Sequence, residues 1–235
     1  MRKSVSFLLV MCWCLLSPTY AQKAVSIYTP KLTGELFIEK TYKGSEYVTQ
    51  EWTNSRILLS TGDTIAGEKI KYDGYLDEII WVHPKNFKRF KLDKPVIEEF
   101  WLMLNDSTTI CYKKMEMPGT ADNAQKTFLE IAHEGALSLY INRKIRQYGV
   151  VEETREGTSF QLEVLVPDNE YCFRLPSGEW ITMRKLKMNN LLKYFPNQRK
   201  AIVQLANQNH LKFKTESQCI RLVRLIDEEI LAVGK

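Results

Sequence analysis

The stretch from Leu59 to Val82, LSTGDTIAGEKIKYDGYLDEIIWV, combines glycines and carboxylates in a way that could serve phosphate or metal binding. A phosphate loop needs glycines that expose successive backbone N–H groups at the start of a helix, whereas Gly62 and Gly67 lie between strand-like segments. The acidic residues are Asp73, Asp77 and Glu78. They lack the alternate spacing and flanking helices of a calcium loop. We therefore expect turn chemistry, because Gly and Asp supply the tight backbone angles of hairpins.

The histidines also lack the spacing of a metal site. His83, His133 and His210 form no H-E-x-x-H pattern, and none lies within helical reach of another. A G-x-S-x-G motif and a protease-like cysteine context are absent from the sequence. We therefore assign no catalytic, cofactor-binding or metal-binding residue. Glycoside hydrolysis needs only two carboxylates that meet in the folded chain, so it stays open as the alternative.

The most distinctive surface feature is the basic and aromatic segment HPKNFKRFKLDK, residues 83–94. Its candidate contacts for an anionic partner are Lys85, Lys88, Arg89 and Lys91. Such a partner could be lipopolysaccharide, a membrane surface or an acidic polymer. The other interpretation is a solvated loop with Phe87 and Phe90 anchored in the core. Charge runs are usually solvated faces, which favours this second interpretation.

From Glu51 onward, apolar and polar residues alternate, and β-branched and aromatic residues are dense. Residues 55–72 predict two strands joined by a tight turn at Gly62-Asp63, with a bulge at Gly67. Further strands are expected in DEIIWVHP, KRFKLDKPVIEEFWLML, STTICYKKMEM, FLEIAHEGALSLYINRKIRQYG and SFQLEVLVPDNEYCFRLPSGEWITMRKL. PGTADNAQK, residues 118–126, is the clearest interior loop. We predict an antiparallel domain over residues 51–185, either a sandwich or a partly open barrel.

The apolar period changes from two to about 3.6 near Leu186. One helix is indicated by Met188, Leu191, Leu192 and Phe195. Pro196 is expected at the first position of a second helix, with Ile202, Leu205 and Ala206 on its apolar face. Thr215 and Gln218 resemble a capping box that opens a third helix, whose apolar side is Cys219, Leu222, Val223, Ile226 and Ile230. Residues 186–235 should dock on the sheet, because three short helices cannot bury their apolar faces alone.

The first 21 residues have the features of a signal peptide. Arg2 and Lys3 precede the apolar run Phe7 to Leu16, and a small-x-small pattern ends at Ala21. The run is too short to span a bilayer, and the sequence has no second long apolar run. We expect export to the periplasm or the exterior, an irregular lead-in over residues 22–50, and no transmembrane segment in the mature chain.

Cysteine content and charge narrow the function classes further. Outside the leader, Cys111, Cys172 and Cys219 are too few for a disulfide framework. At most one pair could bridge, and three buried apolar side chains are the favoured interpretation. The formal net charge is +5, and removing Arg2 and Lys3 leaves +3. This mild excess carries no signature of nucleic-acid binding.

Three fragments together resemble a known set of proteins. They are GDTIAGEKIKYD, FLEIAHEGALSLYINRK and the region from YCFRLPSGEW to RLIDE. The set comprises exported proteins of unknown function that are common in Bacteroidetes-type Gram-negative bacteria. The similar region runs from about Arg56 to Glu228, and its motifs are turn and packing residues. The resemblance implies a sheet followed by helices, and export, and it provides no catalytic residues.

Together these features predict an α+β protein with a mostly antiparallel sheet and a C-terminal set of about three short helices. The leading functional hypothesis is a non-enzymatic, envelope-associated binding or support protein without a cofactor, whose partner is an envelope component or an anionic surface. The alternative is a hydrolase that acts on envelope or dietary glycans.

Overall fold

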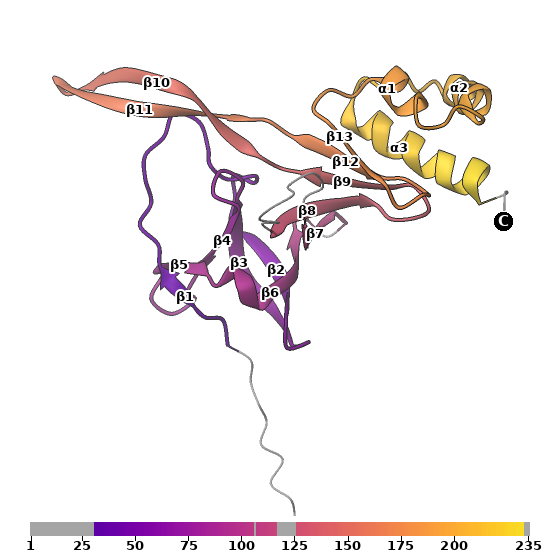
Figure 1. The fold of residues 1–235 in the computed structure, drawn as a ribbon. Helices are drawn as coiled ribbons and strands as arrows, with labels where there is room; N and C mark the ends of the chain where they lie inside the picture. Colours follow the sequence, from indigo (N-terminus) through magenta and orange to yellow (C-terminus); the bar gives the residue numbers. More distant parts are fainter. Residues whose placement is uncertain (1–30, 106, 117–125, 233–235) are drawn as a thin grey trace, which may run out of the picture.

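The computed structural model describes residues 31–105, 107–116 and 126–232. Eleven of the strands form one open antiparallel sheet with the order β1-β5-β4-β3-β2-β6-β7-β8-β9-β12-β13. A separate two-stranded sheet, β10-β11, projects from the body, and three short helices cover the other end of the molecule (Figure 1). The predicted α+β class, with a mostly antiparallel sheet and C-terminal helices, is confirmed. The sheet does not close into a barrel.

The N-terminal half of the sheet comprises β1 (Gly34–Leu36), β2 (Thr53–Leu59), β3 (Thr64–Asp73), β4 (Glu78–Val82), β5 (Arg89–Leu92), β6 (Ile97–Met103) and β7 (Thr109–Glu116). A 3-10 turn, Lys94–Val96, separates β5 from β6 at Pro95. The hairpin predicted for residues 55–72 is β2-β3, and its register shifts opposite Gly67. Gly67 has φ +83°, so the predicted bulge is confirmed.

The C-terminal half comprises β8 (Lys126–His133), β9 (Ser138–Asn142), β12 (Glu170–Arg174) and β13 (Trp180–Met183). A turn at Glu134-Gly135 joins β8 to β9, and one at Pro176-Ser177-Gly178 joins β12 to β13. All five residues of β9 are buried, because both faces are covered: Leu139 packs under the helices, and Tyr140 packs with Leu129 and Cys172 in a separate cluster (Figure 1). β9 therefore lies in the interior of the molecule.

Strands β10 (Ile145–Arg155) and β11 (Thr158–Pro167) form the projecting arm. The sequence predicts a strand in SFQLEVLVP, residues 159–167, but not a hairpin that stands apart from the main sheet. The turn residues Glu156 and Gly157 have φ angles of +49° and +80°. Two successive positive φ angles are typical of a two-residue hairpin loop, so Glu-Gly between two apolar-rich runs was a usable signal.

The helices are α1 (Met188–Leu192), α2 (Arg199–Gln208) and α3 (Glu216–Ile226), followed by a π-helical turn, η3 (Asp227–Leu231). The Thr215 side chain accepts a hydrogen bond from the Gln218 backbone N–H, which confirms the predicted N-cap. The prediction for Pro196 is wrong, because α2 begins at Arg199. Phe195 likewise lies beyond α1, yet it is buried against the same core.

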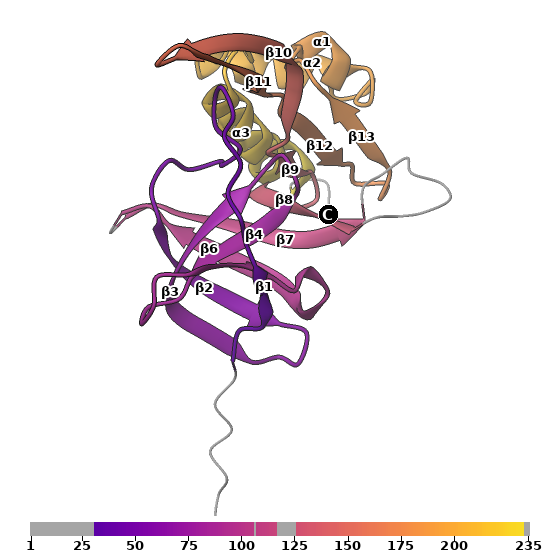
Figure 2. The same cartoon turned by 90° about the vertical axis from the view of Figure 1, so that its left-hand side faces the viewer.

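Two large apolar cores occupy the two halves. The core of the N-terminal half is built within the sheet around Tyr72, Phe100, Tyr112 and Phe128. The core of the C-terminal half contains residues of β9, β12 and β13 together with Leu192, Ile202, Leu205, Cys219, Leu222 and Ile226 of the helices. Figure 2 shows the helices over the C-terminal half and apart from β2 and β3.

Some expectations lie beyond the described residues. The signal peptide, Cys12 and Cys14, residues 22–30 and most of the loop over residues 118–126 are among them. Residues 31–50 contain β1 and two isolated bridges, Lys43 to Val164 and Tyr47 to Asp73. No helix in the described ranges is long and apolar enough to cross a membrane.

Candidate functional site

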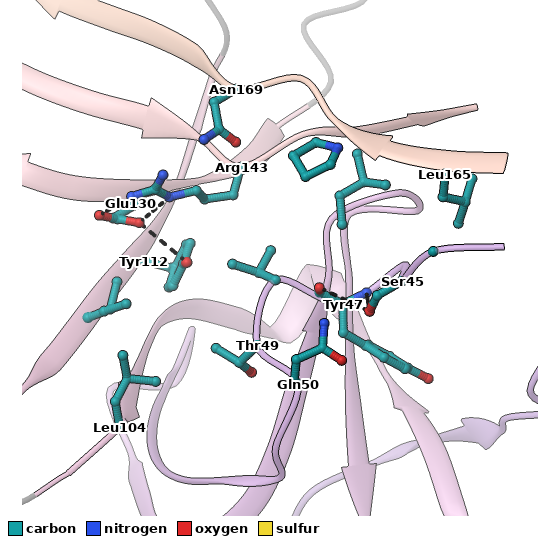
Figure 3. Close-up of a pocket in the computed structure, with 15 residues that line it drawn as sticks. Ser45, Tyr47, Thr49, Gln50, Leu104, Tyr112, Glu130, Arg143, Leu165 and Asn169 are labelled. Carbon is teal, nitrogen blue, oxygen red and sulfur yellow. Dashed lines mark hydrogen bonds and ion pairs between the residues drawn. The ribbon is translucent and has the colours of Figure 1, made fainter. Parts of the chain in front are cut away.

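A large cavity lies where the base of the arm meets the irregular segment 44–50 (Figure 3). Its volume is about 550 Å³. At Gly44 the backbone lies directly against β11, where a Cβ atom would be only 2.4 Å from the carbonyl oxygen of Leu165. This close contact bounds one side of the cavity. Lys43 donates its backbone N–H to Glu163 and accepts one from Leu165, each at 2.9 Å. These bonds hold the segment against β11.

The lining of this cavity is mostly apolar, with a few uncharged polar groups. The apolar lining comes from Tyr47, Val48, Leu104, Ile110, Tyr112, Ile145, Leu165 and Pro167. Ser45, Thr49, Gln50 and Asn169 supply hydroxyl and amide groups. Among the lining residues, only Glu130 and Arg143 carry charge.

Those two charges belong to a closed ion triad made of Glu130, Arg143 and Glu216. The Arg143 guanidinium donates to both oxygens of Glu130, at 2.6 and 2.9 Å. On its other side it donates to both oxygens of Glu216, at 2.8 and 2.7 Å. Fork-to-fork pairs of this kind are the strong, geometrically specific form of the ion pair. The guanidinium is therefore already held on two sides and is not free for a ligand.

Two tyrosines complete the ion triad. The Tyr112 hydroxyl donates to Glu130 at 3.4 Å, and the Tyr171 hydroxyl donates to Glu216 at 3.1 Å. Burial, followed by the neighbouring carboxylate, raises the pKa of each tyrosine. Burial alone would lower the pKa of Arg143, but the two carboxylates raise it above its ordinary value. The arginine therefore stays charged and the tyrosines stay protonated at neutral pH.

A second cavity, of about 330 Å³, lies beside the turn between β3 and β4. It is rich in carboxylates: Glu35, Glu46, Asp73, Glu78 and Glu163 all line it. Tyr42 and Tyr75 also line it and meet edge to face, 5.9 Å apart. The arrangement brings together acidic groups that are distant in sequence, which periodicity alone could not indicate.

Asp73 is the most buried of these carboxylates, with 1% of its surface exposed. One of its oxygens accepts the backbone N–H groups of Tyr75 and Leu76, each at 2.9 Å. The pKa of Asp73 is raised to about 6. Burial is the main cause, Glu46 and Glu78 add to it, and the two backbone hydrogen bonds act in the opposite direction. The predicted turn chemistry is confirmed, and the same side chain lines a cavity.

Asp77 has a different role from Asp73. Its backbone has φ +57°, and its carboxylate accepts hydrogen bonds from the Tyr72 hydroxyl at 2.8 Å and the Phe128 N–H at 3.2 Å. Lys94 and the Thr127 hydroxyl bind the same carboxylate. With these partners in place, Asp77 fastens the β3-β4 turn to β8.

The four cations of the basic segment have different surroundings. Arg89 pairs with Glu39, and Lys91 lies 3.3 Å from Glu78 and 3.7 Å from Glu35. Lys85 and Lys88 are exposed and make no ion pair with the described residues. The expectation that both phenylalanines anchor in the core is wrong for Phe87, which is 77% exposed.

His83 packs against Trp81, with ring centroids 5.1 Å apart. His133 lies 3.0 Å from Asp227, so this pair ties η3 to the β8-β9 turn. His210 follows α2 with φ +55°. Within the described ranges, no group of three or more His, Cys, Asp or Glu residues could hold a metal ion.

Cys111, Cys172 and Cys219 are all unpaired. Cys172 and Cys219 are buried, as the favoured interpretation predicts, and Cys111 is partly exposed. Burial raises the pKa of the Cys111 and Cys172 thiols to about 11, which makes them poor nucleophiles at neutral pH. They therefore act as small apolar side chains.

Chemically, the larger cavity can enclose an uncharged ligand, and the smaller one presents carboxylates to a polar ligand.

Comparisons of the chain with models of protein families, with curated proteins and with solved structures find no match.

Proposed function

We propose that the protein is a non-enzymatic, exported binding protein of the cell envelope. The larger cavity would hold an uncharged, mainly apolar molecule with a few hydroxyl or amide groups. One observation carries the proposal: the two charged residues of the lining, Glu130 and Arg143, pair with each other, so the lining as a whole has no net charge. A cavity with an apolar lining and a few placed polar groups is the usual form of a small-molecule site.

The neutral dye Nile red is a suitable probe, because its fluorescence rises when it leaves water. Ile110→Trp should fill part of the cavity and weaken dye binding by about tenfold or more, since the added ring occupies the ligand's space. Val203→Trp is the matched control, because Val203 lies 38% exposed on α2 and outside the cavity lining. Equal dye binding by both variants would contradict the proposal.

Export is part of the proposal and has its own test. The sequence features of the first 21 residues support it. Mass spectrometry of the protein recovered from its natural host should give a mature chain that begins at Gln22. An intact Met1 to Lys235 chain in the cytoplasmic fraction would contradict it.

The glycan hydrolase remains the second candidate, and the acidic cavity favours it. An acid with a raised pKa beside a second carboxyl group is the arrangement that such enzymes use, and Asp73 lies among other carboxyl groups in this cavity. A panel of nitrophenyl glycosides would test it. Activity that Asp73→Asn abolishes and Asp63→Asn preserves would establish the hydrolase, because Asp63 lies in the exposed β2-β3 turn. Absence of turnover across the panel would favour the binding protein.

A further inference from the structure

The turn between β4 and β5 is closed by its own backbone. The His83 N–H donates to the Lys88 carbonyl, and the Phe87 N–H donates to the His83 carbonyl, each at 2.9 Å. The Asn86 side chain accepts the Lys88 N–H at 3.0 Å. These bonds give the turn a defined shape.

Phe87 is the exceptional residue of this turn. Its φ of +56° lies in the left-handed region, which is unfavourable for a bulky side chain. The side chain is nevertheless 77% exposed, so burial in the core does not compensate for the backbone conformation. Residues held in such conformations cluster at functional positions. We take the exposed ring to be the group that the turn presents.

A second exposed apolar side chain lies next to the turn. β1 pairs with β5 so that Leu36 is opposite Phe90, and the Phe37 N–H donates to the Arg89 carbonyl at 2.9 Å. The next residue, Ile38, is therefore beside Lys88, and it is 80% exposed. The two side chains do not form a pair, because Phe87 faces Gly67 and Val82 of β3 and β4, whereas Ile38 lies on the other side of β5.

Charge distinguishes this tip from the strand that follows it. Lys85 and Lys88 are exposed, and the part of the chain that the structure describes offers neither an ion-pair partner. Arg89 and Lys91, by contrast, are held by Glu39, Glu35 and Glu78. The uncompensated positive charge therefore lies at the tip, beside the exposed Phe87 ring.

We propose that this tip, defined by Lys85, Phe87 and Lys88, docks on an anionic lipid surface. Phe87 enters the boundary between headgroups and acyl chains, where aromatic side chains are favoured. Lys85 and Lys88 lie at the headgroup phosphates. The inference rests on the proposed envelope location for its biological meaning, but it is independent of the cavity and its ligand.

The test is co-sedimentation of the purified protein with vesicles of phosphatidylcholine and phosphatidylglycerol in equal parts, and with vesicles of phosphatidylcholine alone. Binding should favour the anionic vesicles and weaken as salt is added. The double variant Lys85→Glu and Lys88→Glu should lose at least about fivefold in affinity for each lysine. Lys212→Glu with Lys214→Glu makes the same charge change at two other exposed lysines and should leave more of the binding intact.

Phe87→Gly separates docking from folding. Glycine accepts a positive φ without strain, so the variant should unfold at the same temperature as the wild type or higher, yet bind the anionic vesicles less tightly. Tyr148→Ser removes an aromatic side chain of similar exposure from the arm and should bind as the wild type does.

Three results would overturn the proposal. One is equal binding of both vesicle types. Another is wild-type binding by Phe87→Gly and by the Lys85 and Lys88 variant. The last is a lower unfolding temperature for Phe87→Gly, which would show that the ring acts in packing. Retention on heparin without vesicle binding would assign the tip to an acidic polymer instead. Because Nile red binding is measured separately, failure here leaves the cavity proposal standing.

Discussion

In the N-terminal half of the sheet, the Phe100 and Tyr112 rings stack with centroids 4.7 Å apart, and Phe128 meets Phe100 edge to face at 5.1 Å. In the C-terminal half, residues such as Leu139 and Phe173 pack against helices instead. The first core is thus closed by strands that are neighbours in the sheet, and the second needs elements from the end of the chain. Both cores mix aromatic and aliphatic side chains, so the difference lies in what covers them: strands of the curved sheet in the first and helices in the second.

The ion triad lies between the two halves and contacts elements of both. Glu130 belongs to β8, Arg143 to the link between β9 and β10, and Glu216 to the first turn of α3. Tyr112 contributes from the aromatic core. The buried charges therefore lie where the helical layer meets the floor of the larger cavity, and the following predictions test how far they couple the two halves.

The largest effect should come from Arg143→Ala. This change leaves Glu130 and Glu216 facing each other without a cation, and removing one partner of a buried ion pair costs about 3–5 kcal/mol of unfolding free energy. Denaturation by urea would measure it. Arg56→Ala is the control, since Arg56 lies over the Trp101 ring at an exposed position and should cost less than about 1 kcal/mol.

Core truncation in each half should come next. Phe100→Ala and Leu222→Ala both remove fully buried side chains, so each should cost about 2–5 kcal/mol. Hydrogen exchange followed by mass spectrometry would show where protection is lost. If the ion triad couples the halves, each variant should reduce protection in both. Loss confined to the mutated half would mean that the halves open independently.

Asp73→Asn should have a smaller, pH-dependent effect. Because burial raises the pKa of Asp73 to about 6, the contribution of its protonated form to stability is lost as the pH rises from about 4 through 6. The variant should be more stable than the wild type at neutral pH, by on the order of 1–3 kcal/mol, and equally stable near pH 4. Thermal melts across this range would measure it, and a gain independent of pH would refute the burial explanation.

The smallest effect should come from Thr215→Ala. The Thr215 hydroxyl caps α3, and loss of an N-cap costs about 1 kcal/mol. Increased hydrogen exchange should appear in the first turn of α3 and leave β2 and β3 unchanged. Thr158→Ala, at an exposed position on the arm, is the control and should change stability by less than about 0.5 kcal/mol.

Features set by short-range rules were predictable. The Gly62-Asp63 turn, the Gly67 bulge and the Thr215 cap each depend on a few neighbouring residues, and the structure confirms all of them. Pro196 shows the limit of such rules. Proline tolerates the first position of a helix but does not require one, and α2 begins only at Arg199.

The sites depended on contacts that no local rule contains. Arg143 is 13 residues from Glu130 and 73 from Glu216, so their meeting could not be inferred from spacing. The expectation that Phe87 is buried was wrong, because it rested on the rule that an aromatic residue within a charged run usually anchors in the core. Its positive φ angle, which turns the ring outward, depends on hydrogen bonds of the folded turn.

By itself, the sequence determined the antiparallel strands, their turns and the apolar faces of the C-terminal helices, because periodicity and turn residues act over a few positions. Only the tertiary structure decided that the β10-β11 hairpin stands apart as an arm, that Arg143 is enclosed by two glutamates, and that cavities form around segment 35–50. The physical reason is range. Burial and ion pairing depend on which distant segments become neighbours, and that is fixed only when the sheet curves and the helices dock.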